Sequence, residues 1–173
     1  GGGVHVSACQ IIDLYLGLQN REVLSEAMRQ RLSAFVADGG RLLVSGSYLG
    51  ASCADDPGTQ SFLHDVLGTC FLAGNRRATD NAVIGQNLTL PFQRSFNPYI
   101  YPLVRPEIIE PIASSSENFS LFAYQNSRLS AAVAAVPQAG GRTITLGFPF
   151  EAVGDGQSRQ QAMAIMLEWL MAR

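Results

Sequence analysis

The chain has 173 residues, 47% of them hydrophobic and 15% charged, and its formal net charge at pH 7 is −2. These values fit one globular domain with a single core and exclude a disordered chain. No segment approaches the roughly 20 apolar residues of a membrane span, and no basic stripe indicates nucleic-acid binding. Lysine is absent, which excludes lysine-dependent chemistry, and we expect neither a cofactor nor a metal.

The chain begins Gly1-Gly2-Gly3, which we interpret as an expression junction or an interdomain linker. We expect residues 4–173 to form a single α/β domain that belongs to a longer protein. The three cysteines, Cys9, Cys53 and Cys70, are an odd number without CxxC spacing. Neither a disulfide framework nor a cysteine zinc site is therefore predicted.

The first predicted elements form a strand–helix–strand unit. An apolar run predicts a central strand over at least residues 11–16, with Gly17 opening the turn. Apolar residues at helical spacing over 23–36 predict a helix, with Asn20 as its cap and Gly39-Gly40 at its end. A second buried strand follows over residues 41–45, so the crossover should be right-handed.

The middle third is less regular. Residues 51–58 are polar and rich in turn formers, and a short helix is predicted over 59–67. Residues 70–102 contain short strand-like pieces at 82–84 and 88–90, separated by glycine, asparagine and proline. We predict an irregular β-hairpin insertion here.

The last third returns to regular elements. Strands are predicted over residues 120–124, 131–136 and 143–148, and an amphipathic helix over 157–171 with Asp155 or Ser158 as its cap. The whole pattern predicts a mixed sheet covered by helices.

Polar residues follow three of the predicted strands. If the strands that end near Gly17, Ser45 and Phe148 are parallel neighbours, their carboxyl ends meet at one edge, where open α/β sheets bind ligands. The ligand-binding candidates at this edge are Asp13, Gln19, Ser45, Tyr48 and Glu151. Asp13 lies within an apolar strand, so we expect a buried carboxylate with a perturbed pKa, in a structural or a binding role.

The string from Gly147 to Glu151 contains two phenylalanines around a proline. It is interpreted either as a hydrophobic plug over the end of the sheet or as the rigid wall of a cleft with Glu151 at its lip.

Three side chains near the second strand are candidate nucleophiles: Ser45, Ser47 and Cys53. The segment around the serines lacks the G-x-S-x-G pattern of a nucleophile elbow. Only His5 and His64 are available as a histidine base, and the acidic residues after Cys53 would raise the pKa of its thiol. No catalytic site is therefore predicted.

Acidic residues gather after the second strand. Asp55, Asp56, Asp65 and Asn75 match no calcium-loop spacing, so we interpret them as a solvated acidic turn.

Three strings carry a resemblance to a known family: residues 12–19, 39–50 and 146–151. They resemble a domain of large secreted Bacteroidetes proteins that are often labelled xanthan lyase or N-acetylmuramoyl-alanine amidase-like. The resemblance implies a class I glutamine amidotransferase-like fold, which is a flavodoxin-like three-layer α/β/α sandwich with a mostly parallel sheet. It also implies a secreted, cell-surface or periplasmic setting. It transfers no catalytic residue, because Ser45 or Ser47 stands near the position of the family's cysteine and no histidine follows His64.

We therefore expect a non-catalytic accessory domain of a secreted or cell-surface multidomain protein. Its expected partners are neighbouring domains of the parent and a glycan or cell-envelope ligand. The alternative is a glycan or amide hydrolase that pairs Ser45, Ser47 or Cys53 with Glu151 or Asp13. A domain that only packs against its neighbours would instead show a large exposed apolar patch.

Overall fold

The computed structural model describes residues 10–54, 56–74, 81–92, 106–113, 115–138 and 140–172. Within these ranges the chain is a mixed α/β domain, which confirms the predicted class. The elements in chain order are β1 (Ile11–Gly17), α1 (Glu26–Ala37), β2 (Arg41–Gly46), α2 (Leu49–Ala54), α3 (Pro57–Ser61), the π-helical turn η2 (Phe62–Val66), β3 (Thr69–Gly74), β4 (Ala82–Gly85), β5 (Leu88–Pro91), β6 (Glu107–Pro111), β7 (Phe119–Tyr124), β8 (Ser130–Ala135), β9 (Arg142–Leu146), the 3-10 turn η3 (Phe150–Ala152) and α4 (Gly156–Met171).

The main sheet has seven strands in the order β1-β2-β9-β8-β7-β4-β5, and β3 pairs with β6 in a second sheet. Strands β1, β2 and β9 run parallel, so the prediction of three parallel neighbours is confirmed. The expectation of a mostly parallel sheet is wrong, because β9, β8, β7, β4 and β5 pair antiparallel. The connections between β7, β8 and β9 are too short for the crossover that parallel pairing requires.

Strand β1 lies at the edge of the sheet, whereas the sequence predicted a central strand. Among the described residues it pairs with β2 alone, and its side chains are half-buried or exposed. An apolar run of this length looks the same in a central strand and in an edge strand. The sequence therefore could not show that no described strand lies on its outer side.

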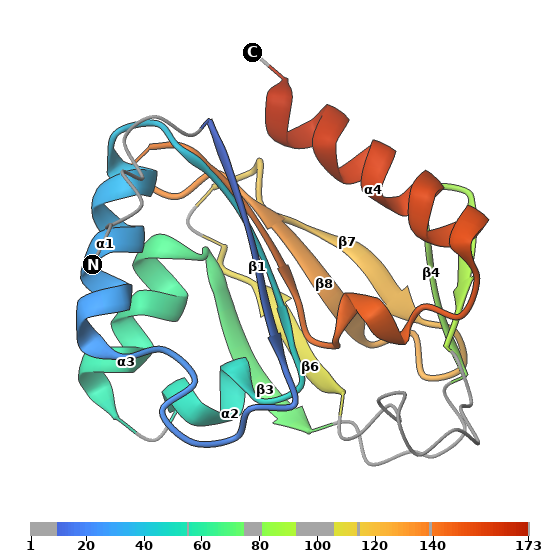
Figure 1. The fold of residues 1–173 in the computed structure, drawn as a ribbon, viewed down its shortest axis with the longest axis horizontal. Helices are drawn as coiled ribbons and strands as arrows, with labels where there is room; N and C mark the ends of the chain where they lie inside the picture. Colours follow the sequence, from blue (N-terminus) through green and yellow to red (C-terminus); the bar gives the residue numbers. More distant parts are fainter. Residues whose placement is uncertain are drawn as a thin grey trace, which may run out of the picture.

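Helices cover both faces of the sheet (Figure 1). Leu42 and Val44 of β2 pack with buried side chains of α1 and η2 on one face. Leu43, between them, points to the other face and belongs to the cluster that includes Met166 of α4. This alternation follows from the two-residue period of a strand. We call the two sides of the sheet the α1 face and the α4 face.

Capping residues mark the ends of helices α1 and α4. Ser25, not the predicted Asn20, caps α1 by accepting a hydrogen bond from the Met28 amide at 3.3 Å. Gly39, with φ +84°, ends the same helix as predicted. Asp155 caps α4, since its carboxylate accepts a hydrogen bond from the Ser158 amide at 2.7 Å.

Three elements in the middle of the chain were not predicted as helix or strand. Residues 49–54 form α2 where a turn was predicted over 51–58, and the paired strands β3 and β6 form at 69–74 and 107–111. The β4–β5 hairpin is confirmed, and Gln86 and Asn87 at its tip both have positive φ, as a two-residue type I′ turn requires. No helix among the described residues is long and apolar enough to cross a membrane.

Candidate functional site

The carboxyl ends of the three parallel strands meet at one edge of the sheet. Ser45 of β2 lies between Tyr15 of β1 and Leu146 of β9 in the register. The chain after β2 is tied to the end of β1, because the Ser47 amide donates a hydrogen bond to the carbonyl of Gly17 at 3.1 Å. The predicted convergence of these strand ends is therefore present.

The candidate side chains divide between the two faces of the sheet. Asp13 and Ser45 share the α4 face with Leu43 by register. Tyr48 instead packs against the core cluster of the α1 face. Tyr48 therefore does not share a site with Asp13, and Gln19 lies apart as well, since its exposed amide donates to the carbonyls of Arg21 and Glu22 at 3.2 Å each.

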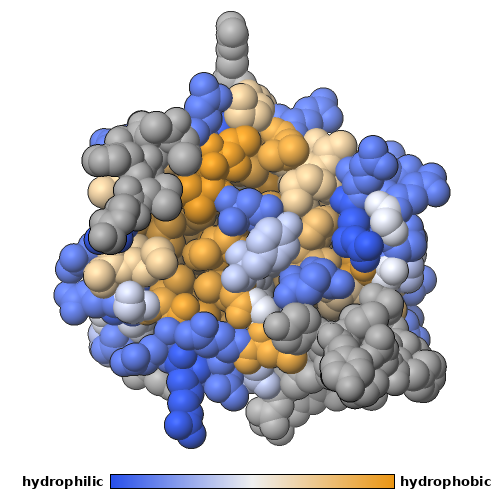
Figure 2. Space-filling model, in the orientation of Figure 1, coloured by the Kyte–Doolittle hydropathy of each residue, from blue (hydrophilic) through white to orange (hydrophobic). Residues whose placement is uncertain are grey.

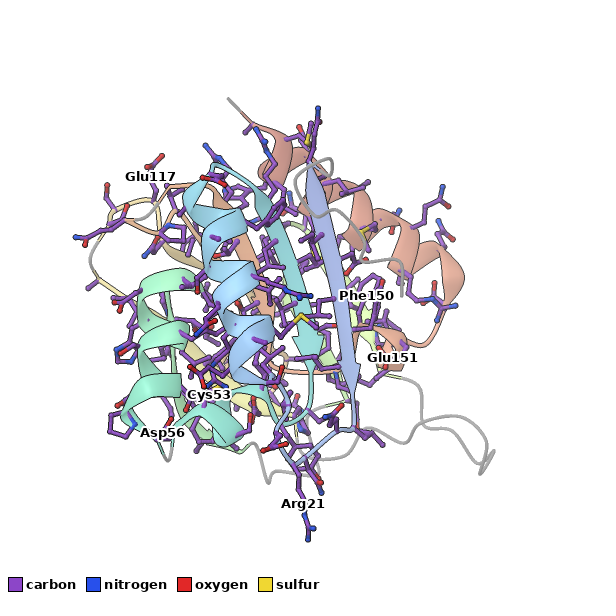
Figure 3. The ribbon with its side chains drawn as sticks, turned by 60° about the vertical axis from the view of Figure 1, so that its left-hand side comes forward. Arg21, Cys53, Asp56, Glu117, Phe150 and Glu151 are labelled. Atoms are coloured by element: carbon purple, nitrogen blue, oxygen red, sulfur yellow. The ribbon has the colours of Figure 1, made fainter. Side chains whose placement is uncertain are left out.

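A shallow groove of about 570 Å³ opens at the carboxyl end of β1 on the α4 face. Its lining residues come from β1, η3 and α4: Tyr15, Phe150, Glu151, Arg159, Gln160 and Met163. The Tyr15 ring is 49% exposed, and its centroid lies 6.4 Å from that of the buried Phe150 ring. In Figure 3, Phe150 and Glu151 lie beside the lower end of β1, on the side away from Cys53. We call this feature the Tyr15 groove.

Asp13 lies next to the Tyr15 groove and is exposed, which corrects the expectation of a buried carboxylate. The reason is the position of β1 at the edge of the sheet, where no described strand lies on its outer side. Partial desolvation raises the pKa of Asp13, and a hydrogen bond with the Tyr15 hydroxyl opposes that rise. Desolvation, followed by the charges of Asp13 and Glu151, raises the pKa of Tyr15 to about 12. The phenol therefore stays protonated and lies in a negative field.

Glu151 places a carboxylate with an unpartnered oxygen in the wall of the Tyr15 groove. Its Oε1 lies 3.6 Å from where a Cβ on Gly17 would stand, so the carboxylate covers the end of β1. Its Oε2 is buried and has no hydrogen-bond partner among the described residues. A buried carboxylate oxygen without a donor is costly, and this unmet hydrogen-bonding capacity needs an explanation.

The phenylalanines near Glu151 fit both interpretations of their string. Phe148 is fully buried and meets Phe92 edge-to-face at 5.2 Å, which is the role of a plug. Phe150 and Glu151 form one wall of the Tyr15 groove, which is the role of a cleft lip.

The candidate nucleophiles have no hydrogen bond to a base among the described residues. Ser45 and Ser47 are each 1% exposed, and no described residue hydrogen-bonds to their Oγ atoms. Cys53 is 2% exposed, its Sγ lies 3.9 Å from the hydroxyl of Ser52, and burial raises the pKa of its thiol. A protonated thiol in the core is a poor nucleophile. Cys53 and Cys70 are not joined in a disulfide.

Several residues that the sequence analysis considered as site residues lie outside the described part of the chain: His5, Cys9, Asp55 and Asn75. Within the described ranges, no group of three or more His, Cys, Asp or Glu side chains is arranged to hold a metal ion.

Glu107, at the start of β6, is the buried carboxylate that the sequence analysis missed. It is 2% exposed, and its two oxygens accept hydrogen bonds from the amides of Gly50 at 2.7 Å and Ala51 at 2.8 Å. Its carbonyl accepts a hydrogen bond from the Tyr124 hydroxyl at 2.7 Å. Its partners on α2 are more than fifty positions away, so no local pattern could indicate the role of this glutamate.

Burial raises the pKa of Glu107 to about 7, although the amides of Ala51 and Gly50 favour the charged form. The carboxylate occupies the first turn of α2, directly after the end of β2. The chain thus fills this part of the carboxyl edge with its own side chain, whereas the Tyr15 groove on the α4 face remains open.

No family model matches the chain, and no curated protein matches it. Among solved structures, the chain is similar to the GH42 β-galactosidase Gan42B of G. stearothermophilus, with a TM-score of 0.54, 15% identity, and coverage of 91% of this chain and 21% of that one. A β-galactosidase of Bacillus circulans sp. alkalophilus gives a TM-score of 0.57 and 11% identity, with coverage of 94% and 23%.

The mmIFT52 N-terminal domain gives a TM-score of 0.59 and 13% identity, with coverage of 96% of this chain and 79% of that one. This chain thus spans about a fifth of the length of the β-galactosidases that it resembles. At these identities the similarity shows the fold alone. The chain shares a mixed α/β fold with a part of these enzymes and with most of the mmIFT52 domain.

Proposed function

We propose that this chain is a non-catalytic accessory domain of a larger secreted or cell-surface protein, and that the Tyr15 groove binds a glycan. The observation that carries the proposal is the exposed Tyr15 ring beside the unpartnered Oε2 of Glu151. An aromatic surface next to convergent polar groups at the carboxyl edge of parallel strands is typical of a ligand site.

The groove offers the contacts that a sugar ring requires. The Tyr15 ring gives an apolar surface on which the C–H face of a pyranose stacks. The carboxylate of Glu151 accepts hydrogen bonds from sugar hydroxyls, while Arg159 and Gln160, which line the groove from α4, donate them. The open shape of the groove suits one or two sugar units of a longer glycan or of a cell-envelope polymer.

The accessory role has support from the site and from the comparisons. Neither the serines nor Cys53 has a described contact with a base, so nothing favours the hydrolase alternative. The fold of this chain makes up about a fifth of the β-galactosidase chains, which supports a place beside other domains in a parent protein. The extracytoplasmic setting rests on the resemblance of residues 12–19, 39–50 and 146–151 to domains of secreted proteins.

We further propose that the fold is a variant of the class I glutamine amidotransferase-like, three-layer arrangement. The parallel core β1-β2-β9 with helices on both faces supports this interpretation. The antiparallel strands β8, β7, β4 and β5 would then extend the sheet beyond the parallel core.

The test is a titration of isotope-labelled protein by NMR with galactose, N-acetylglucosamine, galacto-oligosaccharides and soluble peptidoglycan fragments. We expect at least one probe to give saturable shifts at Tyr15, Glu151 and Gln160. Tyr15→Ala and Glu151→Gln should each weaken the binding about tenfold or more, since each removes a main contact.

Tyr48→Phe is the matched control, because Tyr48 packs on the opposite face of the sheet. It should bind like the wild type. If no glycan gives saturable shifts, or if Tyr48→Phe weakens binding as much as Tyr15→Ala, the Tyr15 groove is not a glycan site.

A further inference from the structure

The outer side of β1 has no partner strand among the described residues. In the register, β1 contacts β2 on one side and no described strand on the other. Figure 2 views the molecule from the side on which β1 lies in front and shows hydrophobic side chains gathered between α1 and α4, with a few polar ones among them. Natural proteins usually protect such an edge, because its backbone groups pair readily with another strand.

The backbone of β1 shows which residues face outward. The Gln10 carbonyl accepts a hydrogen bond from the Arg41 amide of β2 at 3.2 Å. Since the N–H and C=O of one residue in a strand point to the same side, Ile12 and Leu14 also direct theirs toward β2. The Leu16 carbonyl instead accepts a hydrogen bond from the Gln19 amide at 3.2 Å, where the strand ends. The backbone groups of Ile11, Asp13 and Tyr15 consequently point to the free edge.

We propose that a second copy of this chain pairs with β1 in antiparallel orientation, about a two-fold axis at Leu14. Asp13 of each copy then lies opposite Tyr15 of the other, and both residues direct their backbone groups across the interface. Each Asp13–Tyr15 pair exchanges two backbone hydrogen bonds, which is the pattern of a hydrogen-bonded antiparallel pair. The same surface serves both copies, as a two-fold dimer requires.

The side chains select this register. A shift of the axis to Asp13 would place the two Asp13 carboxylates directly opposite one another, which is destabilising. A shift to Tyr15 would place Asp13 opposite Gly17 and shorten the overlap. With the axis at Leu14, each Asp13 carboxylate lies opposite the Tyr15 hydroxyl of the other copy. That hydroxyl exchanges its hydrogen bond to Asp13 of its own chain for one to Asp13 of the other copy.

Apolar side chains support the pairing on both faces. On the α1 face, Leu14 meets its own copy and Ile12 meets Leu16, and all three are only half-buried in the single chain. On the α4 face, the residues Met163, Leu167 and Met171 recur every four positions and so form one line along α4. Met163 lines the Tyr15 groove, and Leu167 and Met171 are 38% and 43% exposed.

This inference goes beyond the proposed function and changes its site. In the dimer, Asp13 of the second copy reaches the rim of the Tyr15 groove, so each groove gains a carboxylate from the other chain. Leu14 points to the opposite face, and a change there tests the dimer without changing any residue that lines the groove. The two proposals can therefore fail separately.

The first experiment is sedimentation velocity of the 173-residue chain over a range of concentrations. We expect a reversible monomer–dimer equilibrium. Asp13→Pro removes an outward N–H, which edge strands tolerate, and should raise the dissociation constant at least about tenfold. Asp13→Asn keeps that N–H and should still dimerise. A wild type that stays monomeric at every concentration overturns the proposal, and so does an Asp13→Pro variant that dimerises like the wild type.

The second experiment remains decisive if Asp13→Pro does not fold. Leu14→Cys places two thiols opposite each other on the two-fold axis, in a pair close enough for a disulfide. Mild oxidation should yield a covalent dimer on a non-reducing gel, well above the wild-type level set by the native cysteines. Leu72→Cys, at a residue 57% exposed on β3, is the matched control. Equal cross-linking of Leu14→Cys and Leu72→Cys overturns the proposal.

Discussion

Glu107 and Glu151 both lie at the carboxyl edge of the parallel strands, yet their surroundings differ. Glu107 is 2% exposed, and both of its oxygens accept backbone amides at the start of α2. Glu151 is half-buried, and its Oε2 has no partner among the described residues. The α2 part of the edge is therefore sealed by the chain itself, while the part beside β1 and α4 is open to a ligand.

This difference shows what turns a carboxylate into a structural or a binding group. The strand ends present amides and polar side chains in both places, and what decides the role is whether the chain supplies a partner. Strand β6 positions Glu107 against the start of α2, and β6 itself packs against β8 through the buried Ile109. Nothing described covers Glu151 in the same way. The predictions below test this contrast.

The largest effect is expected from Glu107→Ala. This change leaves the amides of Gly50 and Ala51 buried without an acceptor and opens a cavity, so the free energy of unfolding should fall by about 3 kcal/mol at pH 5. Urea denaturation followed by circular dichroism measures it. Glu110→Ala, on the same strand, is the matched control and should change stability by less than about 0.5 kcal/mol. Equal effects of the two changes would contradict the structural role of Glu107.

The second prediction concerns pH. The pKa of Glu107 rises from 4.5 to about 7 on folding, so the folded state binds the proton more tightly than the unfolded state. Its contribution is therefore fully present below pH 4.5 and is lost as the pH rises through 7. Between pH 5 and pH 8 the free energy of unfolding should fall by about 2 kcal/mol.

Glu107→Gln isolates this contribution, because it cannot titrate. The variant should lose most of the slope between pH 5 and pH 8, as measured by urea denaturation at a series of pH values. Asp155 does not contribute to this slope. The Ser158 amide holds the pKa of its carboxyl below the usual value, so its effect on stability is confined to pH values under 4. A slope that persists unchanged in Glu107→Gln would assign the pH dependence to other groups.

A smaller effect is expected from Gly147→Ala, at the end of β9. A Cβ there would stand 2.5 Å from the carbonyl oxygen of Glu107, a backbone atom that cannot rotate away. The steric conflict should cost about 2 kcal/mol and displace β6. Gly74→Ala has open space around its Cβ and should stay within about 0.5 kcal/mol of the wild type. Thermal unfolding of the two variants, measured together, tests the close contact between β6 and β9.

The smallest effect is expected from Glu151→Gln. The change keeps the shape of the side chain and removes a charge whose Oε2 lacks a donor, so stability should stay within about 0.5 kcal/mol of the wild type. It forms a matched pair with Glu107→Gln, which should alter the pH dependence strongly. If Glu151→Gln destabilised the protein by more than about 2 kcal/mol, Glu151 would be a structural group like Glu107.

Much of the parallel core could be predicted from local patterns. The apolar runs at 11–16, 41–45 and 143–148 correspond to β1, β2 and β9, which run parallel as predicted. The α4 cap at Asp155 was also among the predicted alternatives. These features depend on residues close in sequence, where the strand period and the capping preference are visible.

The prediction was less complete for the candidate site. Asp13, Ser45 and Glu151 do lie on one side of the sheet, but Tyr48 and Gln19 do not join them. Tyr15, which contributes the main aromatic surface, was read only as part of an apolar strand. Tyr15 is exposed because no described strand lies beside β1, and no local sequence pattern shows whether a strand has a neighbour.

The sequence by itself determined the α/β class, the three parallel strands and the edge at which their polar ends meet, because each depends on a local periodicity. Only the tertiary structure decided that β1 is an edge strand, that Glu107 closes α2, and that the Tyr15 groove stays open. These outcomes depend on contacts such as that between Gly50 and Glu107, which lie 57 positions apart. Burial and hydrogen-bond satisfaction are properties of the packed chain, so they appear only once distant segments meet.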